Sequence, residues 1–377
     1  MSSLRARIAR ETADKLRQAR ERVSQLGALV GLDGFVDEII AVVDKRHDFD
    51  RYQAMPTIEH LGRRILGAVG HSSNFELVVK RVKQGGNGPI MAGALAAAGT
   101  RLTYIGCCGL PNVHPVFADL QAAAVRMISI AEPGHTDALE FGDGKIMLGK
   151  HASLKEVNWE NLVRHVSRQE LVELVNASAL VAMANWTMLP HMTDIWLHLA
   201  DEIFPHTVGR RQMFIDLSDP EKRTAEDMAG ALALLNRFGA WLDVTLGLNL
   251  KEAIEIASVV GAGAADETPA DLERLAAAIR ERVGLACVVI HPRSGAAAAT
   301  AEETAWFAGP FVAQPKISTG AGDHFNAGFA LGQLLSLSLV ESLCVGVATS
   351  GFYVRAAHSP SLDQLADFIA ALPPPEA

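Results

Sequence analysis

Residues 316–332 read Lys-Ile-Ser-Thr-Gly-Ala-Gly-Asp-His-Phe-Asn-Ala-Gly-Phe-Ala-Leu-Gly, with glycines punctuating the first half and apolar residues filling the second. This pattern predicts a tight turn that runs into a buried helix, with Asp323 at the helix start. Gly320 and Gly322 allow the backbone of the turn to approach a ligand closely. Because the first amides of a helix are unpaired and point outward, we expect the turn to bind an anion.

Asp323 is an unusual neighbour for an anion site, because a bound phosphate would repel its carboxylate. Its presence is explained if it accepts a proton from a hydroxyl that attacks the phosphate. The alternative is that Asp323 is an ordinary N-cap and that the glycines only form a turn. Spacing alone leaves both interpretations open.

The run Thr319-Gly-Ala-Gly-Asp323, followed by Phe325-Asn326, resembles the C-terminal signature of the ribokinase-like (PfkB) carbohydrate kinases. The resemblance implies that Asp323 is the catalytic base and that the backbone amides of Gly320, Ala321 and Gly322 form an anion hole. It also implies an α/β fold, with a three-layer α/β/α core, a mainly parallel central sheet and a small β-sheet lid.

Composition limits the class of protein. The chain has 377 residues, of which 49% are hydrophobic and 20% charged, enough apolar material for a sizeable core. Its net charge of −9 argues against a nucleic-acid partner, which demands a basic face. The cysteines show neither metal-ligand spacing nor a disulfide framework. No apolar run reaches the ~18 residues that span a bilayer, and no secretory segment follows Met1, so we expect a cytoplasmic protein with no membrane partner.

The order of patterns along the chain predicts its organisation. Residues 1–27 carry apolar side chains at helical intervals among charged ones, which predicts an N-terminal amphipathic helix extension. We predict one kinase domain over 28–372, with lid segments from about 35–83 and 101–150, and a frayed tail at 373–377. Beyond about residue 150, apolar runs alternate with helical patterns, as in a parallel sheet covered on both faces; the runs are Ala179–Ala184, Met213–Leu217, Trp241–Leu246 and Ala286–Ile290.

Asp33 and Asp37 follow the first apolar strand, at the edge where open α/β sheets bind ligands. Carboxylates suit sugar hydroxyls because each oxygen accepts hydrogen bonds, and the family that the chain resembles carries a substrate-binding aspartate here. Gly85, Gly86 and Asn87 are similar to that family's paired-glycine motif, which implies that they line the substrate site at the hinge of the lid. The plain alternatives are a turn at Asp33, a solvated Asp37 and an ordinary loop before a helix.

Asn249-Leu-Lys-Glu252 matches the Asn-x-x-Glu motif that these kinases use around magnesium and phosphate. The resemblance implies a Mg²⁺ cofactor, with Asn249 near the nucleotide phosphates and Glu252 ordering the metal through water. The same spacing predicts a helix capping box, and both can hold. Thr319, Lys222 and Arg293 are further candidates for contacts with nucleotide phosphate. Lys222 and Arg293 have the equal alternative of being surface charges.

Departures from the family pattern bear on the cofactors. Relatives often carry Thr-x-Gly for nucleotide contact where this chain has His291-Pro-Arg-Ser-Gly295. They also carry Asp-Thr, which helps to hold a monovalent cation, where this chain has Ile317-Ser318, so activation by a monovalent cation is doubtful. The spacing Leu32-Asp-Gly-Phe-Val-Asp37 is similar to the ADP-dependent sugar kinases and leaves ADP open beside ATP as the donor.

The sequence therefore predicts a phosphotransferase that moves the terminal phosphate of a nucleotide, in the first place ATP, to a hydroxyl of a small sugar-like substrate. Lids pair between subunits in many relatives, which suggests a homodimer. The alternatives are a nucleoside kinase, an ADP-dependent sugar kinase and a non-catalytic sugar or nucleotide sensor. An intact Asp323 argues against the sensor, which needs no base.

Overall fold

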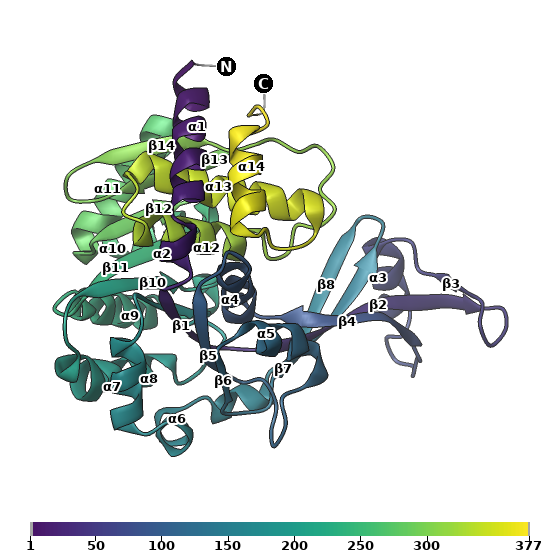
Figure 1. Ribbon diagram of the computed structural model, residues 1–377. Coiled ribbons are helices and arrows are strands. Elements are labelled where there is room, and N and C mark those ends of the chain that lie inside the picture. Colours follow the sequence, from purple (N-terminus) through teal and green to yellow (C-terminus); the bar gives the residue numbers. More distant parts are fainter. Residues whose placement is uncertain (1–2, 376–377) are drawn as a thin grey trace.

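The computed structural model describes residues 3–375 and has two parts, a layered core and a sheet that projects from it (Figure 1). The core contains a nine-stranded sheet in the order β14-β13-β12-β11-β10-β9-β1-β5-β6. From β12 to β6 neighbouring strands are parallel, whereas β13 and β14 are antiparallel. The strands are β1 (Gly27–Leu32), β5 (Arg101–Gly106), β6 (Arg126–Ser129), β9 (Leu180–Ala184), β10 (Arg211–Asp216), β11 (Leu242–Leu248), β12 (Cys287–Ile290), β13 (Gly295–Ala299) and β14 (Thr304–Ala308).

Helices cover both faces of this sheet, because successive strand residues point to opposite sides. In β1, Ala28 and Val30 pack in one apolar cluster, and Leu29 between them packs in the other. The first cluster faces α1 (Ser3–Gln18), α2 (Arg20–Val23), α4 (Asn87–Ala97), α5 (Ala118–Ala123), α12 (Ala321–Leu334), α13 (Leu339–Ala356) and α14 (Leu362–Ala370). The second faces α6 (Trp159–His165), α7 (Arg168–Asn176), α8 (Met192–His198), α9 (Ala225–Phe238), α10 (Leu250–Val260) and α11 (Pro269–Val283). The predicted three-layer α/β/α core is confirmed.

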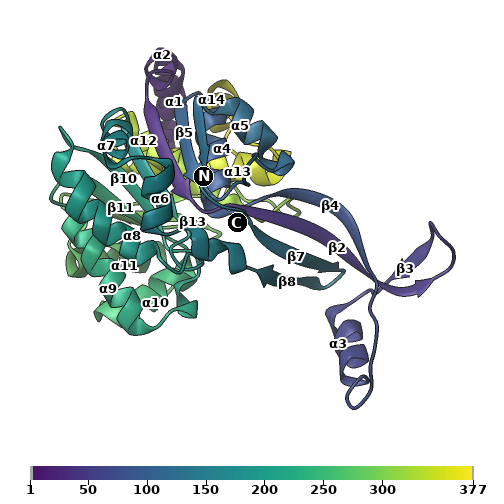
Figure 2. The same cartoon turned by 90° about the horizontal axis from the view of Figure 1, so that it is seen from below.

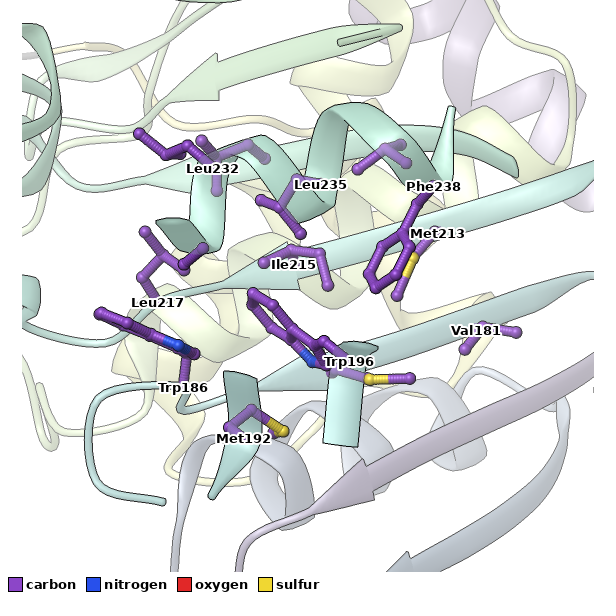
Figure 3. Close-up of a cluster of buried hydrophobic side chains, with 14 of the residues drawn as sticks. Val181, Trp186, Met192, Trp196, Met213, Ile215, Leu217, Leu232, Leu235 and Phe238 are labelled. Atoms are coloured by element: carbon purple, nitrogen blue, oxygen red, sulfur yellow. The ribbon is translucent and has the colours of Figure 1, made fainter. Parts of the chain in front are cut away.

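The second layer is anchored by large side chains that pack on β10. Trp196 of α8 and Phe238 of α9 lie against Met213 and Ile215 of β10 (Figure 3), and all four are fully buried. The two aromatic rings meet edge to face, with their centroids 6.1 Å apart. Since truncating such a side chain costs about 3–5 kcal/mol, this packing fixes the position of β10, which ends at a residue of the site described below.

The projecting sheet, called the lid below, lies beside the core and reaches away from it (Figures 1 and 2). It is formed by β2 (Phe35–Arg46), β3 (Tyr52–Ala54), β4 (Leu77–Gly85), β7 (Gly134–Phe141) and β8 (Gly144–Lys150). β2 pairs with β4 in antiparallel and with β7 in parallel orientation, and β7 and β8 form a hairpin. The predicted small β-sheet lid is confirmed, and it joins the core where Phe35 is paired with both Gly85 and Gly134.

The far end of the lid has a small core of its own, which accounts for the polar segment that follows β2. There α3 (Ile58–Leu66) packs on the sheet, and Figure 2 shows α3 and β3 at the tip. This cluster contains Ile40, Val42, Met55, Leu61 and Leu139. β5 and β6 belong to the central sheet, so within residues 101–150 only the β7–β8 hairpin is part of the lid sheet.

Other features of the described residues agree with the sequence patterns or extend them. The N-terminal helix α1 packs against α13 and α14, and Lys15 forms an ion pair with Glu341 at 2.6 Å. The patterns do not predict the β13–β14 hairpin, because its Gly-Ala-Ala-Ala-Ala strand lacks β-branched residues. The cysteines are free and buried. Between residues 3 and 375, no helix is long and apolar enough to cross a membrane.

Candidate active site

Polar residues from distant parts of the chain meet at the carboxyl ends of the central strands. Chain order reverses at β1, whose neighbours are β5 and β9, and ligands of open α/β sheets bind at such a reversal. Asp33 follows β1, Asn185 follows β9 and Asp216 ends β10. Hydrogen bonds connect this edge to the N-termini of α4 and α12, as described below.

The turn before α12 leaves backbone amides open. The N-cap of α12 is Gly320, whose φ of +90° lies in the left-handed region that favours glycine. Asp323 is therefore the third residue of the helix, and its interpretation as an N-cap is wrong. Within the described part of the chain, the amides of Gly320 and Gly322 make no hydrogen bond, whereas the amide of Ala321 donates to the carbonyl of Ser318 at 3.2 Å.

The carboxyl group of Asp323 is buried among other acids. Burial, and then the charge of Asp216, raise the pKa of Asp323 well above its ordinary value. Asp33 acts in the same direction, and a hydrogen bond from Asn87 opposes the shift. A carboxylate with a raised pKa is a better proton acceptor near neutral pH, so this environment suits a general base.

Asn87 joins Asp323 to the other acids. Its side-chain amide donates to Asp323 Oδ1 at 2.9 Å, and its backbone amide donates to Asp33 Oδ2 at 3.0 Å. Asn87 is the first residue of α4 and follows the glycine pair that ends β4. The root of the lid and the N-terminus of α12 therefore meet through one side chain.

Asp33 is fully buried and its oxygens are occupied. Oδ1 accepts from the amide of Gly88 at 2.9 Å, and Oδ2 accepts from Asn185 Nδ2 at 2.8 Å as well as from the amide of Asn87. Burial raises the pKa of Asp33 to about 6, although these hydrogen bonds lower it. Asp33 thus holds the N-terminus of α4, as a carboxylate in that position can.

Asp37 lies on the face of the lid that adjoins Gly85. It is 6% exposed, and Lys83, its register partner across β2 and β4, places Nζ 3.9 Å from Asp37 Oδ2. Burial raises the pKa of Asp37, and the charge of Lys83 opposes that shift. A Cβ at Gly85 would lie 2.5 Å from each carboxylate oxygen of Asp37, which explains the glycine at this position.

A second group of acids lies at the ends of β10 and β11. Asp216 Oδ2 accepts from Asn326 Nδ2 at 2.7 Å, and Oδ1 accepts from the amide and hydroxyl of Ser218. The predicted capping box of α10 is confirmed, with Asn249 as N-cap and Glu252 three residues on. Burial and the neighbouring Asp216 raise the pKa of Glu252 to about 7.

The remaining candidates lie at the edge of this group. Thr319 is exposed, and its carbonyl accepts from the hydroxyl of Tyr353 at 3.0 Å. Arg293 is exposed in the loop between β12 and β13 and makes no ion pair with another described residue. Lys222 is half-exposed and pairs with Asp219 at 2.9 Å. The structure therefore brings Asp33, Asp37, Gly85, Gly86, Asn87 and Asp323 together and leaves Arg293 and Lys222 at the surface.

Several residues of this site receive no role from the sequence motifs. Asn185, Asp216 and His291 each come at or directly after the end of a central strand, which is the signal that could have found them. A Cβ at Gly322 would lie 3.3 Å from the ring of His291. Burial lowers the pKa of His291 to about 4, so its ring is neutral beside the turn.

Comparisons with known proteins identify the family. A family model described as prokaryotic ketohexokinase matches residues 7–371. A ketohexokinase from Haloferax volcanii is 30% identical over 360 residues, which cover 94% of each chain.

Solved structures share the fold at low sequence identity. A phosphofructokinase-2 variant from Escherichia coli superposes with a TM-score of 0.65 at 16% identity, over 92% of this chain and 99% of the other. A ribokinase from Thermotoga maritima gives a TM-score of 0.63 at 15% identity, over 92% and 99%. With the family match across nearly the whole sequence, the chain belongs to the prokaryotic ketohexokinase family of PfkB-type, ribokinase-like carbohydrate kinases, and it is a phosphotransferase that acts on an alcohol group.

Proposed function

We propose that this protein transfers the γ-phosphoryl group of MgATP to a hydroxyl of a ketohexose. The observation that carries the proposal is the position of Asp323, a buried carboxyl at the start of α12 beside the open amides of Gly320 and Gly322. A base next to an anion site is what deprotonation of a hydroxyl attacking a phosphoryl group requires. The choice of a ketohexose follows the Haloferax volcanii relative, which is a ketohexokinase.

The reaction needs one bond made and one broken. The sugar oxygen bonds to the γ-phosphorus, the bond from that phosphorus to the bridging oxygen of ADP breaks, and the hydroxyl proton moves to Asp323 Oδ2. The amides of Gly320 and Gly322 stabilise the charge on the transferred group. Asp37 binds other hydroxyls of the sugar from the lid, and closure of the lid excludes water as a competing nucleophile.

Magnesium fits the oxygen atoms at the ends of β10 and β11. We propose that Glu252 orders the water shell of Mg²⁺ and that Asn249 lies near the nucleotide phosphates. Two observations support the fit: the pKa of Glu252 is raised beside another buried acid, and Asn326 Oδ1 is buried without a hydrogen-bond partner among the described residues. Mg²⁺ prefers such oxygen donors and usually keeps several waters. When bound, it neutralises charge on the phosphates.

ATP is the proposed donor, because a ribokinase of the same fold from Arabidopsis thaliana was solved with ribose and ATP. The deciding experiment measures phosphate transfer by the wild-type protein with ATP and ADP as separate donors. The acceptors are ketohexoses, aldohexoses, pentoses, sugar phosphates and nucleosides. Turnover confined to a ketohexose with ATP supports the proposal. Turnover with ADP alone would mean that the proposed donor is wrong, and turnover with a nucleoside would mean that the proposed acceptor is wrong. Nucleotide binding without any turnover favours a sensor.

We further propose that two copies of the chain pair through their lids. Register places Val82 of β4 and Leu148 of β8 on the face of the lid opposite Asp37, because Val82 is paired with Glu38 and Leu148 with Asp137. Val82 is 45% and Leu148 is 48% exposed. Apolar side chains left half-exposed on one face of a projecting sheet are typical of a contact surface.

A further inference from the structure

We propose that Asn87 is a positioning residue for phosphoryl transfer: its side-chain amide fixes the carboxylate of Asp323 and ties it to the root of the lid. This inference rests on the proposed role of Asp323 as the base. It assigns Asn87 a role different from the direct sugar contact that the paired-glycine motif implies.

The backbone of Asn87 is held firmly while its side chain reaches across the site. Its amide donates to Asp33 Oδ2, and the next amide, that of Gly88, donates to Asp33 Oδ1. A Cβ at Gly88 would lie 2.5 Å from Asp33 Oδ1, so the contact between the two segments is close. With the backbone fixed by a fully buried carboxylate, the Asn87 side chain has a defined starting point for its bond to Asp323.

That bond orients the base. Among the described residues, Asn87 Nδ2 is the one side-chain donor to Asp323, and it bonds to Oδ1. Oδ2 keeps its lone pairs for the proton of an attacking hydroxyl. The nearby hydroxyl of Tyr353 does not replace this donor, because it donates to the carbonyl of Thr319.

The electrostatic setting makes the bond more important. The charged or titratable groups that face Asp323 are Asp33 after β1, Asp216 at the end of β10, Tyr353 on α13 and the neutral His291 packed on Gly322. Both aspartates oppose ionisation of Asp323, and the amide of Asn87 favours it. Without that amide the carboxylate would lose its side-chain donor among the described residues and keep the neighbouring like charges.

Asn87 also lies directly after the glycine pair at the root of the lid. β4 ends at Gly85, Gly86 has a φ of +99°, and Asn87 follows at once. Because the backbone of Asn87 is bound to the buried Asp33, the lid can rotate at the glycine pair while Asn87 and the base keep their positions. The bond between Asn87 and Asp323 thus holds the reacting carboxylate on the core side of the glycine pair.

The test compares Asn87→Leu, which has the same shape without a donor, with Asn87→Gln, which retains an amide. A hydrogen bond to a charged group is worth enough that its loss lowers kcat by roughly 10- to 100-fold. We expect this loss in Asn87→Leu, with the acidic limb of the pH profile of kcat/KM moved to higher pH and the KM for the sugar changed less than kcat. Asn87→Gln should recover part of kcat and return the limb towards the wild-type pH. Gln84→Leu is the matched control, because Gln84 lies on the face of β4 opposite that of Lys83 and Asp37.

The inference fails if Asn87→Leu raises only the KM for the sugar and leaves kcat and the acidic limb at wild-type values, because that is the behaviour of a simple sugar ligand. A second measurement needs no substrate. The loss of unfolding free energy in Asn87→Leu should be largest at alkaline pH and shrink as the pH falls through the pKa of Asp323. If the wild-type enzyme uses another acceptor, the proposed substrate is wrong, but the same variants are measured with that acceptor.

Discussion

Asp323 has both a proposed chemical role and an electrostatic cost, and one variant tests both. Asp323→Asn keeps the shape of the side chain and removes its charge. We expect phosphoryl transfer to fall by about 10²- to 10⁴-fold, the usual contribution of a general base, with the affinity for MgATP retained. Steady-state kinetics measure the first quantity and nucleotide titration the second. Wild-type turnover in this variant would remove Asp323 from the mechanism.

The same substitution predicts a change in the pH dependence of stability. Because the pKa of Asp323 is raised in the folded protein, the folded state keeps this proton at pH values where the unfolded chain has released it. The stability that the group contributes therefore falls as the pH rises from the unfolded pKa of about 3.9 towards the folded pKa. We expect Asp323→Asn to melt at a higher temperature than wild type at pH 8, by a margin that narrows towards pH 5. A margin independent of pH would contradict this account.

Gly85 and Gly93 form a matched pair for testing Asp37. An added Cβ at Gly85 would press on the carboxylate of Asp37 at 2.5 Å, whereas at Gly93 in α4 nothing lies within 4 Å. Gly85→Ala should displace Asp37 and raise the KM for the sugar roughly 10-fold or more, as expected for a lost hydrogen bond to a charged group. Gly93→Ala should leave the kinetics unchanged and stabilise α4 by up to about 1 kcal/mol. Equal KM values in the two variants would show that Asp37 does not bind the sugar.

At the scale of residues, motifs formed by consecutive residues can be predicted from the sequence, whereas contacts between distant segments cannot. The turn before α12 and the capping box of α10 are visible because each is encoded within a few consecutive residues. Asp216 and Asn185 belong to the same group only because β9 and β10 are neighbours in the sheet. No spacing along the chain encodes that neighbourhood, so the motifs give neither residue a role in the site.

At the scale of elements, α1 and α2 test whether packing or charge holds the N-terminal helices on the core. Leu16 of α1 is fully buried among residues of the first helix layer, whereas Arg20 of α2 and Asp363 form an exposed ion pair. Leu16→Ala should lower the free energy of unfolding by about 2–5 kcal/mol, and Arg20→Gln should cause no measurable loss, since exposed pairs contribute little. Urea unfolding with both variants measures the difference. Similar losses in the two would mean that the exposed ion pair contributes as much as burial to the docking of the N-terminal helices.

The elements of the lid are harder to predict than those of the core. Core strands between β1 and β12 are continuous apolar runs, because both faces of the central sheet are covered. The lid has one face towards the site and carries polar residues such as Asp37 and Lys83 there, so its strands are less apolar. The apolar cluster at its tip contains residues as far apart in the sequence as Ile40 and Leu139. The sequence patterns therefore do not predict the helix α3 or the length of β2, which the structure shows.

At the scale of the whole molecule, the core fixes the position of the lid, but part of the packing within the lid is independent of the core. It joins the core at Phe35, Gly85 and Gly134, and it has a separate apolar cluster at its tip. A sheet of this kind can move as a unit about its root. The surface opposite Asp37 then stays available whether the lid is open or closed, so a partner bound there would not block the sugar.

The proposed pairing of lids predicts the mass of the molecule in solution. Light scattering should give twice the chain mass of 40.3 kDa for the wild type. The double variant Val82→Lys, Leu148→Lys places two charges on the outer face of the lid, and burying them without partners is unfavourable, so it should be a monomer with an unchanged melting temperature at low concentration. Val208→Lys is the control, because Val208 is 79% exposed in the loop before β10. A monomeric wild type would refute the pairing, and a dimeric double variant would place the interface elsewhere.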